Sequence, residues 1–218
     1  MAKQIDILDA VDLIKDGMCV MIGGFMANGT PEIIMDALVK KGVKELTVIA
    51  NDSGTPETGV GKLIVAGAVN KIITSHIGLN PVAGQLMNEG KLEVELVPQG
   101  TLIEQIRAGG AGLGGVLTPT GLGTDVAKGK QIVQVDGKEF LLEKPLKADV
   151  ALLRGSIVDE GGNIFYSGTT RNFNPIIATA ADIVIVAAEE IVPLGGILAE
   201  NIVTPGIFVD YIVGGEPK

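Results

Sequence analysis

Short apolar runs alternate with stretches of helical periodicity along most of this chain. Short segments rich in apolar residues, which suit strands of a buried sheet, occur at 18–22, 46–50, 71–74, 92–97, 148–153 and 183–187. Apolar residues spaced three or four apart predict helices over 5–15, 32–41 and 101–108, and less regular patterns favour helices over 59–67 and 81–89. This alternation is typical of βαβ units, so we expect an α/β fold with a Rossmann-like, open, mainly parallel sheet flanked by helices.

Two of these helices carry start signals. Thr30 is predicted to cap the helix over 32–41, with Pro31 as its first residue and Gly42 as its stop. Thr101 and Glu104 have the spacing of a capping box, which places the start of another helix at Thr101.

A long glycine-rich segment follows that helix. Residues 109–124 hold no periodic pattern, and irregular segments of this length in compact domains are more often functional than structural. The strands predicted at 131–135 and 138–142 flank Asp136-Gly137, which supplies the positive φ angles of a tight hairpin turn. No linker, repeat or low-complexity stretch divides the chain, so we expect a single domain over 1–218.

Composition narrows the class of protein. Hydrophobic residues make up 46% of the chain and aromatic residues 3%, so we expect a core of aliphatic side chains with close backbone contacts at the 31 glycines. A mean hydropathy of +0.41 fits either a large aliphatic core or an extensive subunit interface. The net charge of −9 argues against binding to nucleic acid, which rewards clustered Lys and Arg.

Cysteine usage and the length of the apolar runs bear on location. Cys19 is the single cysteine, so no internal disulfide can form, and its place in a strand pattern favours an inert core thiol. No apolar run reaches the roughly 18 residues of a membrane span, and the N-terminus lacks the basic and apolar parts of a signal segment. These features predict a cytoplasmic protein that does not associate with membranes.

The segment from Gly23 to Pro31 is the most informative part of the chain. It joins an apolar strand to a helix start through glycines, and the free N–H groups at the start of a helix suit a phosphate or a carboxylate. A tight turn between strand and helix, with no ligand, explains the same glycines. Spacing alone leaves both interpretations open.

Other residues have chemically versatile side chains but weak support for a chemical role. His76 is the single histidine and follows a strand, but no paired Asp or Ser motif accompanies it, so a structural role is favoured over a base. Arg171 stands at the polar entry to an apolar helix, which favours a capped helix start over carboxylate recognition. Asp52, Asp136 and Asp159 lie in turn contexts, and no cluster has metal-ligand spacing, so we expect no metal.

Several motifs together resemble the alpha side of the class I coenzyme A transferases. The first comprises Asp16-Gly17, an apolar strand, Gly23-Gly24-Phe25, Gly29 and Pro31, and the second runs from Pro98 to Gly110. Shorter segments agree with the same group: Asn51-Asp52, Ser75-His76-Ile77-Gly78, Asn172-Phe173-Asn174-Pro175 and Thr204-Pro205-Gly206. The resemblance spans almost the entire chain and is strongest to acetate, butyrate and acetoacetate transferases. It implies the fold that these enzymes share with sugar-phosphate isomerases.

The resemblance implies roles for particular residues. In the family, the glutamine of the Pro-Gln-Gly turn lies beside the reacting thioester and donates to its oxygen, a role that falls on Gln99. The glycine turn is then expected to line the path of coenzyme A, which is a substrate here and not a tightly bound cofactor. The residues of that path are Gly24, Phe25, Met26, Ala27, Asn28, Gly29 and Thr30.

One element of the family's chemistry is missing from the chain. In the family, a glutamate attacks acyl-CoA and becomes a glutamyl-CoA thioester, and this glutamate belongs to a Ser-Glu-Asn-Gly motif. The nearest text here, Ala199-Glu200-Asn201-Ile202, lacks both the serine and the glycine, so Glu200 is expected to be a surface or capping residue. The resemblance therefore implies an alpha subunit whose beta subunit, in an α2β2 assembly, carries the nucleophile.

Three classes of function remain open at this point. The first is a CoA-transferase alpha subunit acting on acetate or butyrate with acetoacetate, and 3-oxoacid and 3-oxoadipate transferases are its nearest variants. The second is a sugar-phosphate isomerase of the same fold type, whose catalytic acid and base would lie within one chain. The third is a non-catalytic protein that binds an anionic metabolite at the glycine loop. Activity of the lone chain on ribose 5-phosphate separates the second class from the first.

Overall fold

A nine-stranded sheet forms the centre of the computed structural model, which describes residues 2–214. The strand order is β1-β12-β11-β9-β2-β3-β4-β5, and every pair of neighbours along it is parallel. Strand β10 pairs antiparallel with β9. The strands are β1 (Lys3–Ile5), β2 (Cys19–Ile22), β3 (Leu46–Ala50), β4 (Val69–Thr74), β5 (Glu93–Leu96), β9 (Ala148–Asp159), β10 (Ile164–Phe165), β11 (Ala181–Val192) and β12 (Tyr211–Val213).

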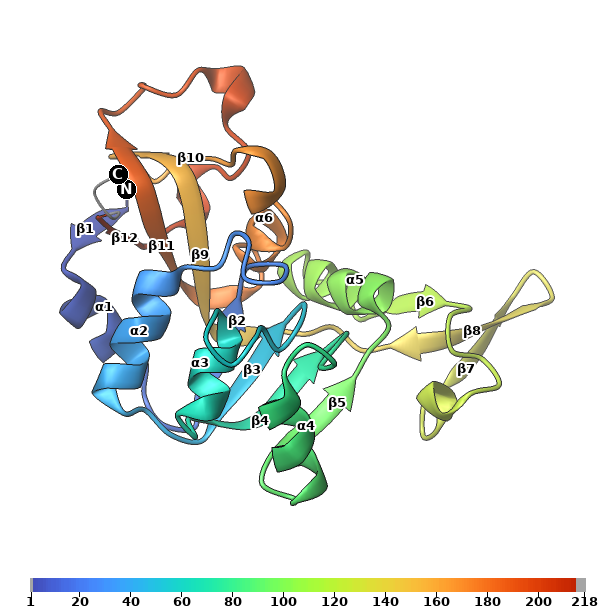
Figure 1. The fold of residues 1–218 in the computed structure, drawn as a ribbon. Helices are drawn as coiled ribbons and strands as arrows, with labels where there is room; N and C mark the ends of the chain where they lie inside the picture. Colours follow the sequence, from blue (N-terminus) through green and yellow to red (C-terminus); the bar gives the residue numbers. More distant parts are fainter. Residues whose placement is uncertain (1, 215–218) are drawn as a thin grey trace.

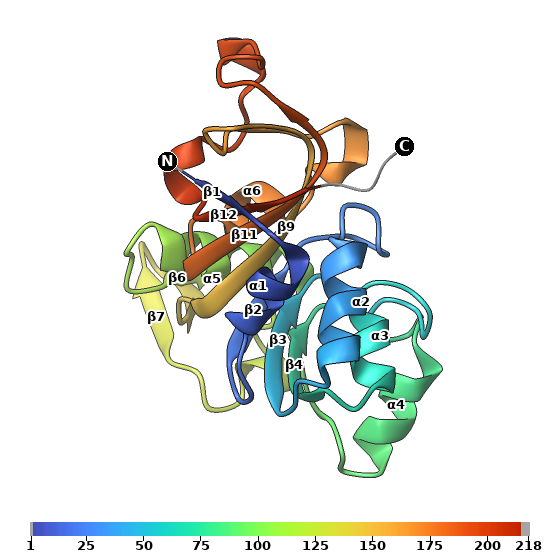
Figure 2. The same cartoon turned by 90° about the vertical axis from the view of Figure 1, so that its left-hand side faces the viewer.

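Helices cover both faces of this sheet (Figures 1 and 2). One face carries α1 (Ile7–Asp12), α2 (Glu32–Lys41), α3 (Val60–Val65) and α4 (Pro81–Asn88), and the other carries α5 (Gln99–Gly110) and α6 (Asn174–Ile177). Because side chains alternate along a strand, neighbouring residues enter different cores: Val48 packs with the first group of helices and Ile49 with the second. The predicted α/β fold with a mainly parallel sheet is confirmed.

The predicted strands are present, but some boundaries differ. Strands β9 and β11 have twelve residues each, about twice the predicted length, because they continue past their apolar centres into positions with polar side chains. The helix predicted over 5–15 is wrong at its start. Ile5 ends strand β1 and pairs with Val213, so only Ile7–Asp12 is helical.

A second sheet of three antiparallel strands, in the order β6-β8-β7, stands apart from the first (Figure 1). Its strands are β6 (Val116–Thr118), β7 (Ile132–Val135) and β8 (Lys138–Glu143). The predicted turn between β7 and β8 is confirmed, with φ of 50° at Asp136 and 73° at Gly137. Short 3-10 helices occur at Asp125–Ala127, Gly168–Thr170, Ala199–Asn201 and Gly206–Phe208. The single domain over 1–218 stays a prediction.

Both predicted helix caps are wrong. Pro31 is the capping residue of α2, and the buried hydroxyl of Thr30 turns back to donate to the Gly23 carbonyl at 3.0 Å. Helix α5 begins at Gln99, so Thr101 lies inside it and is buried. Glu104 pairs with Arg107 instead of answering a cap. The two threonine side chains are therefore packed in the interior and do not cap the helices. The stop of α2 at Gly42, with φ of 75°, is confirmed.

Candidate functional site

The predicted site residues share one edge of the main sheet. Strands β2, β3, β4 and β5 are parallel neighbours, so the segments that follow them, 23–31, 51–59, 75–80 and Gln99, leave the sheet at the same edge. The chain order reverses at β2, which has β3 on one side and β9 on the other. Ligands of open α/β sheets bind outside the carboxyl ends of the strands at such a switch point, and the glycine loop stands there.

The glycine loop, residues 23–31, forms a tight turn of its own. Phe25 and Asn28 exchange two backbone hydrogen bonds of 3.0 Å, and the two residues between them, Met26 and Ala27, have φ of 49° and 62°. Positive φ at two successive non-glycine residues is costly, and it persists only where the surroundings hold it in place. The side chains of Phe25 and Met26 are half exposed to solvent, at 50% and 54%.

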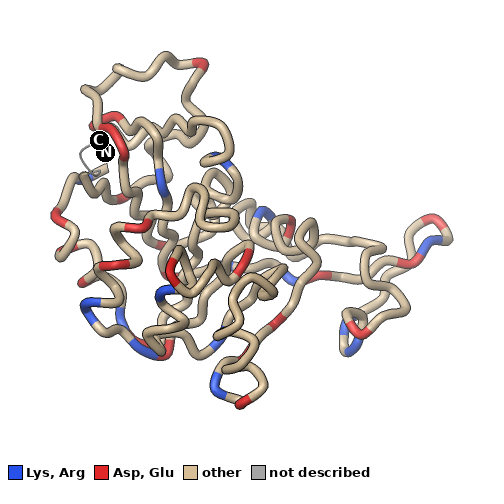
Figure 3. The backbone as a smooth tube through the Cα atoms, viewed as in Figure 1, with Lys and Arg blue, Asp and Glu red and all other residues tan. Residues whose placement is uncertain are grey.

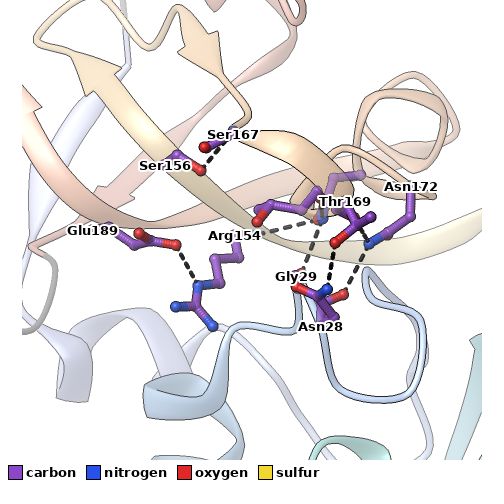
Figure 4. Close-up of polar contacts among 10 residues, drawn as sticks. Asn28, Gly29, Arg154, Ser156, Ser167, Thr169, Asn172 and Glu189 are labelled. Atoms are coloured by element: carbon purple, nitrogen blue, oxygen red, sulfur yellow. Dashed lines mark hydrogen bonds and ion pairs between the residues drawn. The ribbon is translucent and has the colours of Figure 1, made fainter.

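Two asparagines at or just before the start of α6, Asn172 and Asn174, hold the loop, and Figure 4 labels Asn172. Asn172 accepts from the Gly24 N–H at 3.0 Å and donates to the Asn28 carbonyl at 2.8 Å. Asn174 is fully buried and donates to the Gly29 carbonyl at 2.9 Å. Asn28 also donates to the hydroxyl of Thr169.

The predicted capped helix start at 171–175 is corrected by these contacts. Helix α6 begins at Asn174, and its capping residue Phe173 makes no side-chain cap. The asparagine side chains bond the glycine loop instead of the helix N-terminus. Sequence reasoning missed this role. The sequence does contain a hint of this role. Two asparagines, one residue apart, stand directly before a proline, whereas a single asparagine is enough to cap a helix.

Asp52 holds the loop from the opposite side. Its carboxylate accepts from the Met26 N–H at 2.8 Å, from the Gly54 N–H at 2.8 Å and from the Asn51 amide at 2.9 Å. The prediction of Asp52 as a turn residue is therefore confirmed but incomplete, since the same carboxylate fixes the turn that follows β2. The glycine loop is clamped between two segments that are distant in sequence.

The clamping uses most of the loop's hydrogen-bond donors. The N–H groups of Gly24, Phe25, Met26, Asn28 and Thr30 all bond other atoms of the chain. Among the described residues, the N–H groups of Ala27 and Gly29 have no partner within hydrogen-bonding distance. An anionic group at this loop would therefore meet few free donors, because Gly29 is buried and Ala27 is half-buried.

Gln99 is the first residue of α5 and its side chain is exposed. Strand β5 ends at Leu96, and a short turn through Pro98 leads into the helix. Two chain neighbours of Gln99, Pro98 and Gly100, line a groove of about 420 Å³ together with Thr101 and Leu117, and Gln99 itself is not one of the lining residues. Three strand spacings, about 14 Å in all, separate β5 from β2 along the sheet edge.

Other candidate residues have simpler surroundings. His76 is exposed, and its ring lies against Gly78, where a Cβ atom would come within 2.9 Å of it. Glu200 and Arg171 are exposed as well, and Glu200 lies in the short helix Ala199–Asn201. Within residues 2–214, no group of three or more His, Cys, Asp or Glu side chains is arranged to hold a metal ion. No helix over the same residues is long and apolar enough to cross a bilayer.

Comparisons with known proteins agree with this geometry. The family model described as "Coenzyme A transferase" matches residues 5–215. The chain is 54% identical to the acetate CoA-transferase subunit alpha of Escherichia coli K12, over 97% of this chain and 96% of the relative. It is 57% identical to the acetoacetyl-CoA:acetate/butyrate CoA transferase alpha subunit of Clostridium acetobutylicum, over 91% of both.

The fold is similar to that of a solved structure at much lower identity. The acyl-CoA transferase YdiF of Escherichia coli O157:H7 matches with a TM-score of 0.86 at 22% identity. The match covers 98% of this chain and 47% of that one, so the present chain spans about half of that enzyme. The identities to the two alpha subunits and the match of the family model show that the chain belongs to the coenzyme A transferase family.

Proposed function

We propose that this chain is the alpha subunit of a heteromeric short-chain acyl-CoA:carboxylate CoA-transferase that acts on acetate or butyrate with acetoacetate. The observation that carries the proposal is the identity of 54% and 57%, over at least 91% of the chain, to alpha subunits whose names specify these substrates. The partner is a beta subunit in an α2β2 assembly in the cytoplasm, and coenzyme A passes through the site as a substrate.

The chemistry needs a nucleophile from the partner. A glutamate carboxylate of the beta subunit attacks the acyl carbon of acyl-CoA and the CoA thiolate leaves, which gives a mixed anhydride. The thiolate then attacks the glutamyl carbonyl, so that the first carboxylic acid departs and a glutamyl-CoA thioester remains. A second carboxylate reverses both steps and leaves as the new acyl-CoA. The beta subunit therefore carries every covalent intermediate of this ping-pong cycle.

Gln99 contributes the oxyanion donor in this proposal. Negative charge grows on the thioester oxygen during attack, and an amide N–H placed in advance stabilises that charge more than the ground-state carbonyl. Its place shortly after the carboxyl end of β5, on the ligand edge of the sheet, supports the role. An exposed side chain at the start of a helix is free to meet a thioester held by another subunit.

The glycine loop, from Gly24 to Thr30, lines the path of coenzyme A. Support comes from its place at the topological switch point and from the half-exposed side chains of Phe25 and Met26. An apolar, rigid turn suits the pantetheine arm, which makes few polar contacts along its methylene stretches.

The lone chain tests the assignment to a subunit. Purified by itself it should fold but transfer no coenzyme A from acetoacetyl-CoA to acetate, and the beta subunit encoded with it should restore turnover. Borohydride reduction of the acyl-CoA-treated complex should then modify a glutamate of the beta subunit alone. Robust turnover by the lone chain, or a reduced glutamate at Glu104 or Glu200, would refute the proposal.

A substitution tests the oxyanion donor. Gln99→Ala should lower kcat by about 10²- to 10³-fold and change coenzyme A binding little, because the bond forms mainly in the transition state. Gln99→Glu should be worse, since it places negative charge beside the forming oxyanion. Gln85→Ala, which removes an exposed glutamine from α4, is the matched control and should leave kcat unchanged. Near-normal kcat in an assembled Gln99→Ala complex would show that the donors lie elsewhere.

The two carboxylic acids that the enzyme exchanges can be identified by a separate assay. A panel of acetate, butyrate, succinate and 3-oxoadipate as acceptors, each assayed with acetoacetyl-CoA, separates the proposed activity from that of 3-oxoacid and 3-oxoadipate transferases. A higher kcat/KM for the dicarboxylates than for acetate and butyrate would assign the chain to the 3-oxoacid or 3-oxoadipate transferases.

A further inference from the structure

The three-stranded sheet forms an arm, residues 113–144, that projects from the body of the molecule (Figure 1). The arm is firmly attached at its base. Glu143 is buried, accepts from Gln105 of α5 at 3.1 Å and pairs with Lys130 at 2.7 Å. An attached arm of this kind presents its surface in a fixed orientation.

The register of the strands divides the arm into two faces. Leu117 lies opposite Leu142, and Val133 lies opposite Phe140, so these side chains share one face, because directly paired residues and every second residue along a strand point the same way. Val135 belongs to this face too. We call it the open face; its apolar members are Leu117, Val133, Val135, Phe140 and Leu142.

The opposite face of the arm is covered by its own chain. Leu141 on that face is fully buried, and the segment between β6 and β7 packs beside it: a Cβ atom at Gly121 would touch both Val126 and Leu141. Ile132 stands at the margin of that covered face and is 51% exposed. The arm therefore closes a small core on one side only.

The open face is only partly covered, and Val133, Phe140 and Leu142 on it are half-buried. None of its five apolar members belongs to, or packs against, either core of the main sheet. Leu117 is 43% exposed and Val135 is 41% exposed. The charged residues of the arm lie mainly at the hairpin tip and around the segment before β7 (Figure 3), and Lys138 at the tip pairs with Val135 and so stands on the open face. A contiguous apolar strip on a projecting sheet is typical of an interface with another chain.

The open face is continuous with the groove beside Gln99. Leu117 belongs to the open face and also lines that groove, together with Gly100 and Thr101 from the first turn of α5. A chain seated on the open face thus reaches the start of α5, where Gln99 stands.

From this continuity we infer that the open face of the arm is the docking surface of the beta subunit. The inference rests on the proposed function, in which Gln99 needs a glutamate from another chain. A second copy of the present chain seated on the same face would cover the groove without supplying a Ser-Glu-Asn-Gly motif. The occupant is therefore the beta subunit, which meets the arm with an apolar surface and brings its nucleophile to the groove.

Replacing apolar residues of the open face by aspartate tests whether this face binds the beta subunit. Leu117→Asp/Val135→Asp changes two exposed residues of the open face, and Ile132→Asp makes the same kind of change at the margin of the covered face of the same sheet. Titration calorimetry with the purified beta subunit should give a Kd raised at least about 100-fold by the double substitution and less than about threefold by Ile132→Asp. Light scattering of each lone chain gives its oligomeric state.

Each outcome decides the inference. An unchanged Kd for the double variant overturns the inference, and so does an equal loss of affinity with Ile132→Asp. A dimer of the lone chain that the double substitution breaks, while binding of the beta subunit persists, overturns it as well. Should the aspartates unfold the chain, as circular dichroism would report, Leu117→Ser/Val135→Thr replaces them with an expected rise in Kd of about tenfold. The titration uses no substrate, so it measures binding independently of activity. A complex that assembles through the arm but lacks transferase activity would refute the proposed function and would still support the docking surface.

Discussion

Asn174→Ala removes the buried side chain that joins the glycine loop to the rest of the sheet. The amide donates to the carbonyls of Gly29 at 2.9 Å and Thr170 at 2.8 Å, and its oxygen accepts from the Arg154 N–H at 3.1 Å. The side chain is fully buried, so truncation to alanine leaves two carbonyls and one N–H without partners in an enclosed space. Each of these three groups then carries a desolvation penalty.

The expected loss of stability follows from that count. A buried polar group without a partner costs about 1–3 kcal/mol, so three of them set an upper range of roughly 3–9 kcal/mol. A water molecule that enters the vacated space recovers part of this, which gives an expected loss of about 3–4 kcal/mol. That is a large share of the 5–15 kcal/mol typical of whole domains.

The matched control is Asn172→Ala. Asn172 makes four hydrogen bonds, two of them to the glycine loop, but it is only partly buried, so water replaces its bonds and the expected loss is about 1 kcal/mol. Urea unfolding followed by far-UV circular dichroism gives both values, with the slope m expected to stay constant. A loss below about 1 kcal/mol for Asn174→Ala would refute the reasoning.

A double-mutant cycle sharpens the test. A Cβ atom at Gly23 would lie 2.0 Å from the Asn174 amide oxygen, so Gly23→Ala clashes in the wild-type chain. The clash disappears once the amide is gone. The double variant should therefore be more stable than the sum of the single losses by at least about 1 kcal/mol, and strict additivity would show that the two residues do not touch as described.

Three further outcomes follow from the structure. Gly29→Val should weaken coenzyme A binding and also lower stability, because Gly29 has φ of 81° and a Cβ atom there would lie 2.7 Å from the Thr170 carbonyl; an unchanged KM and melting temperature would contradict this. Burial, together with the nearby Asp149, raises the pKa of Cys19 to about 11, so iodoacetamide should alkylate the folded chain at pH 8.5 about 100-fold more slowly than the unfolded chain. Burial favours the neutral form of Asp159, but its hydrogen bonds outweigh this and lower its pKa, so its stabilising contribution is present above pH 4 or so and is lost as pH falls below that. Asp159→Asn should therefore cost about 2 kcal/mol at pH 7 in urea unfolding and less at pH 3, and an equal cost at both values would refute the assignment.

Periodicity predicted the main sheet well because its strands are buried on both faces. Runs such as 46–50 and 148–153 have a single polar residue each, Thr47 and Asp149, which leaves few alternatives to a central parallel strand. Helix starts were predicted less well. A threonine before a helix is a good cap when it is free, but Thr30 and Thr101 are needed in the interior, and burial against the rest of the fold is not visible in a local pattern.

The site shows the same limit. The glycine loop was located from its own residues, and its identity came from the family resemblance. Its anchors were not found, because Asp52 and Asn174 are separated by more than 100 residues and meet at the loop only once the sheet brings β3 and β9 to either side of β2. A short-range signal cannot report a contact that depends on strand order.

The electrostatics of the loop bear on how coenzyme A is held. The chain has a net charge of −9, and a carboxylate, Asp52, lies directly beneath the turn. Arg154 is nearby in the close-up, but its guanidinium is paired with Glu189 at 2.8 Å (Figure 4). With few free N–H groups and two exposed apolar side chains, Phe25 and Met26, the loop offers an anion less than it offers an apolar arm. If the loop lines the coenzyme A path as proposed, the charge that attracts the coenzyme A phosphates has to come from outside the loop.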